Sequence, residues 1–237
     1  KAPSLPASAM QAPNTVKSED ECRKILASIG IPMANSEVAK SAKEAISIWR
    51  AINGPVALKI VSLDILHKTE IGGVRLNLND PTEIEDAFND IIEAGTKHYP
   101  KANIEGVIVS EMISEGVETV LGVINDPIFG PAVMFGLGGV FVEVLGDVTF
   151  RLAPFDLSEA HRMIAEIKGI KMLYGARGAA SSDIDAIADA LVKLSIFANT
   201  NSDKISSIDI NPFIVRPEGQ GAVGVDALII PHGVDVI

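Results

Sequence analysis

The sequence has few aromatic residues: Phe, Tyr and Trp make up 5% of its 237 residues, with a single tryptophan. Hydrophobic residues still account for 47% and charged residues for 22%, as is usual for a globular protein. A core must therefore be built from Ile, Val, Leu and Ala side chains. This composition favours buried strands covered by helices over an all-β sandwich.

Cysteine is almost absent. The one residue, Cys22, excludes an internal disulfide and a cysteine-based metal cage, and it fits a reducing compartment. Cys22 lies in an amphipathic helix pattern, which indicates a packing role. No apolar run approaches the ~18 residues that a membrane-spanning helix needs. We therefore expect a cytoplasmic protein.

Positive charge is scarce, since 20 Lys and Arg residues face 31 Asp and Glu residues and the formal net charge is -11. Such a surface repels DNA, RNA and anionic lipid, which excludes nucleic acid and membrane as partners. An anionic ligand such as a nucleotide would need a local cluster of cationic side chains.

Composition and turn signals divide the chain into three segments. Residues 1–15 are rich in Ala, Pro and Ser, begin without Met, and are expected to form a flexible linker in a longer chain or in one half of a two-part enzyme. We expect a first lobe at 16–113, with a mobile polar loop at 62–73, and a second lobe at 114–237. Strands mixed with helices and hairpin-like connections predict an α+β fold in two lobes.

Hydrophobic periodicity places the individual elements within these lobes. Turn and capping signals bound several of them, such as Pro81 in the first turn of a helix and Asn53 with Gly54 after another. The helices are expected at 18–28, 39–51, 81–99, 156–167 and 182–199, and the strands at 56–61, 74–78, 105–113, 119–124, 132–135, 148–152, 205–215 and 222–230.

Two candidate phosphate ligands lie in the first lobe. Lys59 stands in the middle of an apolar strand, where an ammonium group needs an anionic partner unless it reaches water at the strand edge. His67 lies in the polar loop, beside Lys68 and ahead of Gly72 and Gly73. An imidazole nitrogen can accept a phosphoryl group, although a solvated loop histidine is the ordinary interpretation of such a residue taken alone.

The second lobe carries candidate groups for a metal and for phosphate. Asp209 and Asn211 are two residues apart on a predicted strand and so share a face, and Asp226 lies on the next predicted strand. Three hard oxygen ligands suit Mg²⁺, while a polar rim at the strand ends is the alternative. The glycines of Phe135–Gly139 either bring backbone N–H groups to phosphate or form a tight turn, and the segment matches neither a Walker A nor a Rossmann loop.

Charged residues near the expected lobe junction complete the set. Glu111 and Glu118 flank the junction, and each is either a ligand for a ribose hydroxyl or a cation, or a solvated acid. Arg151 on a strand and Arg177 in a loop join Lys59 and Lys68 in supplying the local positive charge that an anionic ligand requires.

Taken together, these motifs resemble the ATP-grasp (β) part of NDP-forming acyl-CoA synthetases, a group related to succinyl-CoA synthetase. The resemblance runs in order from Ser18 to Ile230 with short gaps. The stretches that carry it are Leu58–Ser62, Ile65–Lys68 with Gly72–Val74, Asn125–Pro127 with Phe129–Pro131, Phe135–Gly139 with Val142–Glu143, and Asp209–Pro212.

The resemblance implies an ATP-grasp fold and a reversible reaction that couples acyl-CoA, phosphate and ADP to acid, CoA and ATP. A CoA-binding (α-type) domain or subunit is the implied partner, and it phosphorylates its own histidine from acyl phosphate. The ATP-grasp part then passes the phosphoryl group to the nucleotide, with ATP or ADP as substrate and Mg²⁺ as cofactor. The CoA-binding part is absent from this sequence, so the chain alone is not expected to complete the reaction. The acyl group and the choice of ADP or GDP stay open.

The resemblance also implies roles for single residues. His67 would be the second phosphoryl carrier, on a swinging loop, and Asp209, Asn211 and Asp226 would hold Mg²⁺. The implied nucleotide ligands are Lys59 at the phosphates, Glu111 and Met112 at an adenine cleft between the lobes, Glu118, and the phosphate neighbours Gly136, Gly138, Gly139 and Arg151.

Two other functions fit the same residues. A different ATP-grasp ligase would join a carboxylate to an amine through acyl phosphate and would not need His67. A non-catalytic nucleotide-binding or docking module would bind ATP without becoming phosphorylated.

Overall fold

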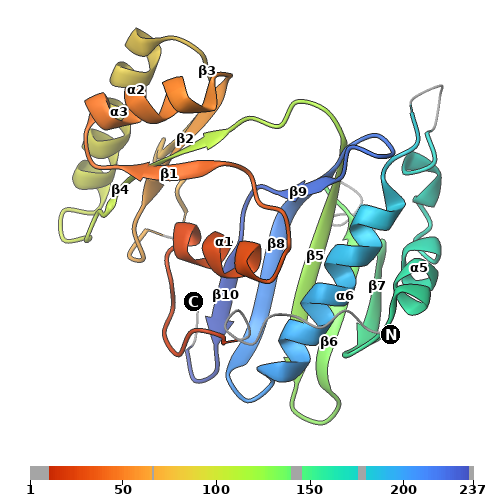
Figure 1. Ribbon diagram of the computed structural model, residues 1–237. Helices are drawn as coiled ribbons and strands as arrows, with labels where there is room; N and C mark the ends of the chain where they lie inside the picture. The colour runs from red at the N-terminus through yellow and green to blue at the C-terminus, as the bar shows by residue number, and fades with distance from the viewer. Residues whose placement is uncertain (1–10, 66, 140–145, 176–179, 235–237) are drawn as a thin grey trace. The chain divides into compact units, whose positions relative to one another are not determined.

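The computed structural model describes residues 11–65, 67–139, 146–175 and 180–234, which fall into two compact units (Figure 1). Unit 1 combines Lys1–Lys17, Glu21–Met33 and Glu115–Ile237, and unit 2 combines Ser18–Asp20 with Ala34–Ser114. Residues 21–33, which the sequence analysis assigned to the first lobe, therefore cluster with the later part of the chain. No helix among the described residues is both long and apolar enough to cross a membrane.

Unit 2 is a four-stranded antiparallel sheet with two helices on one face. Its strand order is β1-β4-β2-β3. The side chains of Leu58 and Ile60 are fully buried, in one cluster with Ile84 and Ile91 of the second helix. The elements are β1 (Ser36–Ala39), α2 (Ala42–Ile52), β2 (Val56–Val61), β3 (Val74–Leu78), α3 (Pro81–His98) and β4 (Gly106–Glu111).

Helix α2 begins later than the sequence predicts, because Ser41 caps it. Ser41 has extended backbone angles, and its hydroxyl accepts a hydrogen bond from the Glu44 N–H. The Glu44 carboxylate in turn accepts from the N–H of Lys40, the residue before the cap, at 2.7 Å, in a variation on the capping box. Ala39, expected in the helix, instead ends strand β1, which the sequence analysis missed.

Unit 1 is a six-stranded antiparallel sheet with order β10-β8-β5-β6-β7, and β9 pairs with β8. Helix α6 contacts β5, β6 and β8, and α5 packs beside β7, so the helices cover one face of this sheet (Figure 1). The strands are β5 (Val117–Asp126), β6 (Gly130–Leu137), β7 (Val148–Leu152), β8 (Ile205–Val215), β9 (Ala222–Gly224) and β10 (Leu228–Pro231). The helices are α1 (Glu19–Ser28), which enters unit 1 at Glu21, α5 (Leu157–Ala165) and α6 (Ile184–Thr200).

The two faces of the unit 1 sheet differ in burial. Across neighbouring strands, Ile208, Val123 and Val133 lie opposite one another and are buried in the helix-covered core. The adjacent row of the ladder contains Asp209 opposite Gly122, and side chains of adjacent rows point to opposite faces. Asp209 and its row therefore lie on the face away from the helices.

The structure differs from the sequence-based expectations at two further places in this unit. The predicted strand 222–230 is two strands, because β9 pairs with β8 beyond Pro212 and β10 pairs before it. Proline has no N–H to give to a continuous ladder. Ala12, expected in a flexible linker, is buried, and its N–H donates to the Asn201 side-chain carbonyl at 2.8 Å.

Candidate functional site

Lys59 projects from the middle of β2 on the face away from α2 and α3. The neighbours Leu58 and Ile60 point into the core, so alternation turns Lys59 to the opposite face. Its side chain is 19% exposed, and its Nζ lies 3.1 and 3.2 Å from the two carboxylate oxygens of Glu19. The anionic partner that an ammonium group on an apolar strand requires is thus supplied from within the chain.

His67 lies in the loop between β2 and β3 with its side chain 70% exposed. Its Nδ1 is 3.6 Å from a carboxylate oxygen of Glu70, which is also exposed. The loop is tied on both sides of the histidine. Before it, the Asp64 carboxylate accepts from the Asn103 N–H at 2.7 Å, and after it the Gly73 N–H donates to the Lys68 carbonyl at 2.8 Å. The imidazole is therefore accessible at the tip of an anchored loop.

Glu111 and Met112 lie at the end of β4. Both carboxylate oxygens of Glu111 accept hydrogen bonds from Asn35, one from its backbone N–H at 2.9 Å and one from its side-chain amide at 3.0 Å. The Met112 N–H donates to the Pro55 carbonyl at 2.9 Å. The Glu111 side chain thus holds the chain ahead of β1. Any contact of this segment with adenine would have to use other groups, such as backbone carbonyls.

Glu118, Asp209 and Asn211 share the helix-free face of the unit 1 sheet. Glu118 and Gly122 are four residues apart on β5, so they share a face, and Gly122 lies opposite Asp209. Asn211 is two residues beyond Asp209 on β8, and all three polar side chains are exposed. The structure thus has Asp209 and Asn211 on the same face of the sheet, as the sequence predicts.

Asp226 does not lie on a strand as predicted but in the connection between β9 and β10. Its carbonyl accepts a hydrogen bond from the Asn211 N–H at 3.3 Å, and the next-door Val225 N–H donates to the Pro212 carbonyl at 2.9 Å. The interruption of the ladder at Pro212 therefore brings Asp226 beside Asn211, so the two residues are neighbours although the strand assignment was wrong.

The donor set on this face of the unit 1 sheet fits Mg²⁺. Although the Asp209 side chain reaches solvent, the protein around it is close enough that partial desolvation raises the pKa of its carboxyl above the ordinary value. A cation beside that carboxylate would offset this cost. The described residues contain no cluster of three His, Cys, Asp or Glu ligands. The candidate set differs from such a cluster, because it combines the carboxylates of Asp209 and Asp226 with the side-chain amide of Asn211. Magnesium commonly takes one or two carboxylates and completes its shell with water and nucleotide phosphates.

The glycines after β5 have different roles from one another. Gly136 lies within β6, paired with strands on both sides. The Gly138 N–H donates to the Glu118 carbonyl at 2.7 Å, and a Cβ on Gly138 would lie 2.9 Å from the Glu118 Cβ. Gly138 thus permits a close approach to Glu118, and its N–H is already used. Gly139 has a φ of +59°, which favours glycine.

Arg151 does not lie with these residues. Its position on β7 is opposite Val133, which places it on the helix-covered face. There its guanidinium pairs with Glu159 of α5 and with Glu166, the residue that follows that helix. In this structure the charge of Arg151 is therefore paired with carboxylates that hold α5 to the sheet edge, and its contact with phosphate stays a prediction. Arg177 and the stretch Val142–Glu143 lie outside the described residues.

Sequence reasoning missed Glu19, the first residue of α1. Its carboxylate, 9% exposed, also lies 3.0 Å from the Nζ of Lys68 and so contacts both lysines of the candidate phosphate site. The capping-box pattern around Ser18 predicts a helix start there, but periodicity does not indicate which remote cation a first-turn carboxylate meets.

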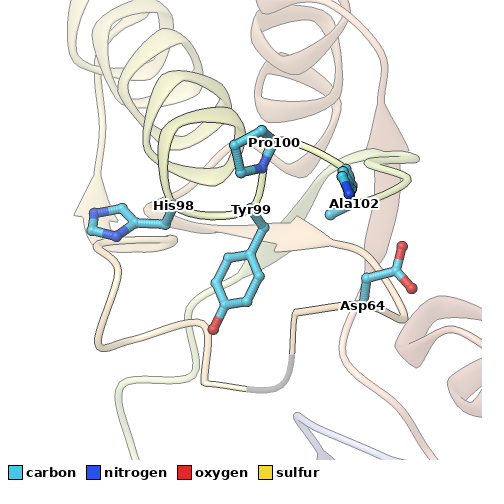
Figure 2. Close-up of a pocket in the computed structure, with 6 residues that line it drawn as sticks. Asp64, His98, Tyr99, Pro100 and Ala102 are labelled. Carbon is cyan, nitrogen blue, oxygen red and sulfur yellow. The ribbon is translucent and has the colours of Figure 1, made fainter.

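A pocket of about 490 Å³ opens at the end of α3 in unit 2. Figure 2 shows the Tyr99 ring lying between His98 and Asp64, with Pro100 and Ala102 above. None of the predicted site residues lines this pocket. Asp64, one of its lining residues, accepts a hydrogen bond from the Asn103 N–H. We therefore assign no role in phosphate chemistry to this pocket.

Comparison with known proteins defines the class first. The ATP-grasp domain family matches residues 8–230, so the α+β fold in two units is an ATP-grasp fold, as predicted. Among curated proteins, the chain is 43% identical over 219 residues to the β subunit of ADP-forming acetate–CoA ligase II of Pyrococcus furiosus, covering 92% of this chain and 93% of that one.

Solved structures lead to the same group. The dinucleotide-forming acetyl-coenzyme A synthetase 1 of Candidatus Korarchaeum cryptofilum, in complex with coenzyme A and Ca-AMPCP, has a TM-score of 0.87 and 44% identity over 92% of this chain and 94% of that chain. A form of that enzyme with Mg-AMPPCP, whose phosphohistidine segment points towards the nucleotide binding site, has a TM-score of 0.81 and 40% identity over 92% and 93%. The chain therefore belongs to the family of ATP-grasp β subunits and domains of ADP-forming acyl-CoA synthetases. The resemblance inferred from the sequence is confirmed.

Proposed function

We propose that this chain is the nucleotide-binding, phosphoryl-transfer part of an ADP-forming acyl-CoA ligase, and that His67 carries the phosphoryl group. The complete enzyme would interconvert acyl-CoA, phosphate and ADP with acid, CoA and ATP. The observation that carries the proposal is the exposed His67 imidazole on a loop tied at both ends, in a chain of this family. A solved relative with a phosphohistidine segment supports it.

In the direction of acid activation, an imidazole nitrogen of His67 attacks the γ-phosphorus of ATP. The nitrogen–phosphorus bond forms while the bond to the ADP oxygen breaks, ADP leaves with the electron pair, and the imidazole gives up its N–H proton. Such a step asks the protein mainly for position and charge neutralisation. In unit 2, Lys59 supplies an ammonium group for the nucleotide phosphates.

In unit 1, Asp209, Asn211 and Asp226 would hold Mg²⁺, which neutralises phosphate charge when it is bound with the nucleotide. Glu118, on the same sheet face as Asp209, is the candidate for a nucleotide hydroxyl. The proposed role of the glycine segment is to let the backbone pack closely beside Glu118 near the nucleotide. This segment contains Gly136, Gly138 and Gly139. The Glu111–Met112 segment is proposed to meet adenine through its backbone.

The thioester chemistry belongs, in this proposal, to a CoA-binding partner. The Pyrococcus relative is named as a β subunit, which supports a separate α-type subunit or domain as that partner. The acyl group is selected there, so this chain is proposed to serve one reaction class whatever acid the partner binds. A cytoplasmic location stays a prediction.

Labelling with γ-labelled ATP and Mg²⁺ tests the proposal on the full protein with its CoA-binding partner. We expect label that is labile in acid and stable in base, as phosphoramidates are, and we expect none on the His67→Ala variant. His98→Ala is the matched control, since His98 is another exposed histidine of unit 2.

The alternatives predict other outcomes. A carboxylate–amine ligase of the same fold would keep its ATP-dependent activity in the His67→Ala variant. A docking module would bind ATP and take up no label in any form. Either result would remove His67 from the phosphoryl path.

A further inference from the structure

The carboxylate of Glu19 lies between two ammonium groups of unit 2. One of its oxygens is 3.1 Å and the other 3.2 Å from the Nζ of Lys59, and the second oxygen is also 3.0 Å from the Nζ of Lys68. The exposed side-chain fractions are 9% for Glu19, 19% for Lys59 and 21% for Lys68. Charge-assisted hydrogen bonds of this length in a largely desolvated place are stronger than exposed ion pairs.

These three residues come from different parts of the unit. Lys59 projects from the rigid strand β2, Lys68 directly follows His67 in the loop, and Glu19 stands in the first turn of α1. A carboxylate at a helix N-terminus is also favoured by the helix dipole. Glu19 therefore ties the loop that carries His67 to the strand that carries Lys59.

Backbone hydrogen bonds at Gly73 hold the backbone of Lys68 close to strand β2. The Gly73 N–H donates to the Lys68 carbonyl at 2.8 Å, and the Gly73 carbonyl accepts from the Ile60 N–H at 2.9 Å. A Cβ on Gly73 would lie 2.8 Å from the Lys68 carbonyl oxygen, so the turn is closed tightly. With the Lys68 backbone held on β2, fixing its side chain also restricts the direction in which the preceding His67 leaves the turn.

We propose that Glu19 is a positioning residue for phosphoryl transfer: its carboxylate occupies the phosphate position between Lys59 and Lys68 and holds the base of the His67 loop until a phosphoryl group replaces it. A phosphate offers the same kind of oxygen acceptors with more negative charge, so it competes for both ammonium groups. Displacement of Glu19 then releases Lys68 to follow the phosphoryl group. This inference rests on the proposed function of His67 and Lys59.

Glu19→Gln tests the proposal in the full protein, because it keeps the shape of the side chain and removes its charge. The matched control is Glu21→Gln on the same helix, where Glu21 pairs with Lys17 at 3.0 Å and is exposed. Three readouts are compared: amide hydrogen exchange at Gly72 and Gly73 without nucleotide, calorimetric binding of Mg-ADP, and the rate of label uptake from ATP by His67.

For Glu19→Gln we expect exchange at Gly72 and Gly73 to be about tenfold faster, as for the loss of a partly buried charged contact. Mg-ADP binding should be equal or several-fold tighter, since a competing anion is gone, while His67 phosphorylation should slow by about tenfold. Glu21→Gln should change none of the three. A merely structural role would instead weaken Mg-ADP binding along with stability.

Unchanged exchange, or weaker Mg-ADP binding, overturns the proposal. Glu19→Asp is the second variant in case Glu19→Gln does not fold: it keeps the charge but shortens the reach, so exchange should rise while Mg-ADP binding stays as in the wild type. If the wild-type protein itself took up no label, the proposed function would fail, and the exchange comparison would still decide whether Glu19 holds the loop.

Discussion

At the scale of the residue, the direction of a side chain determines which groups it can contact, whatever its chemical type. Arg151 and Asp209 both lie on strands of the unit 1 sheet, and both were predicted near a nucleotide. The pairing of Arg151 with Val133 and of Asp209 with Gly122 places them on opposite faces. The carboxylates of Glu166 and then Glu159 raise the pKa of Arg151, because their hydrogen bonds favour its charged form. Arg151 therefore helps to hold α5 against β7.

The alternation that predicted a shared face for Asp209 and Asn211 is a property of one strand, so it could be read from the sequence. Which face Arg151 shows depends on the register between strands, and that register is set by tertiary pairing. The Glu19 contact with two lysines was unpredictable for the same reason, since it joins positions 40 and 49 residues apart.

His161 provides a pH-dependent contact between α5 and α6. Its Nε2 lies 2.8 Å from a carboxylate oxygen of Asp185, and its Nδ1 lies 2.7 Å from the Leu157 carbonyl. The Asp185 carboxylate, and then the Leu157 carbonyl, raise the pKa of His161 above its ordinary value of 6.5. The protonated form is favoured in the folded state, so the stabilisation is fully present below pH 6.5 and is lost as pH rises through the higher folded pKa.

An NMR titration of the histidine ring protons tests this contact. Asp185→Asn should move the His161 midpoint downward and leave the midpoints of the other three histidines in place. Asp185 is 91% exposed, so solvent screening limits the gain in stability to at most about 0.5 kcal/mol. An unshifted His161 midpoint in Asp185→Asn would show that the contact is absent in solution.

At the scale of the element, patterns with strong boundaries were predicted well. The strands β2, β3, β7 and β8 begin and end at the predicted residues, since turn residues or a change of periodicity bound each of them. Strand β1 was missed because four residues are too few to show a period. Strand 222–230 was predicted whole because its interruption depends on the partner strand, where Pro212 stands.

Gly106, the first residue of β4, is required by the packing of two strands. Its φ is +150°, and a Cβ there would meet the Ala39 carbonyl oxygen of β1. A backbone atom cannot move aside as a flexible side chain can, so Gly106→Ala should lower the free energy of unfolding by about 1–3 kcal/mol.

Chemical denaturation measures this effect, with Gly54→Ala as the matched control. A Cβ on Gly54 has nothing within 4 Å, so the control should change stability by less than about 0.5 kcal/mol. Equal stabilities of the two variants would show that β1 and β4 separate readily enough to admit a methyl group.

At the scale of the whole chain, each unit has its own hydrophobic core. The core of unit 1 contains Phe135, Leu194 and Phe197, and that of unit 2 contains Ile60 and Ile91, all of them fully buried. The two clusters have no buried member in common. Local stability is therefore expected to respond to core changes unit by unit.

Core truncations in each unit test this independence. Ile91→Ala should cost about 2–5 kcal/mol, and the loss of amide exchange protection should be confined to unit 2. Leu194→Ala should cost a similar amount and lower protection only in unit 1. Loss of protection throughout the chain in both variants would indicate that the units unfold as one cooperative body.

The single thiol of the chain has a practical consequence. Cys22 is fully buried, in the core of unit 1, and its Sγ contacts the Lys17 carbonyl at 3.8 Å. Maleimide dyes react with accessible thiolates, so they should not label Cys22 while unit 1 is folded. A cysteine introduced at an exposed loop position such as Thr69 can then be coupled to one fluorophore in the native background. Fluorescence from that dye would follow the His67 loop in real time, without any change to the protein's own cysteine.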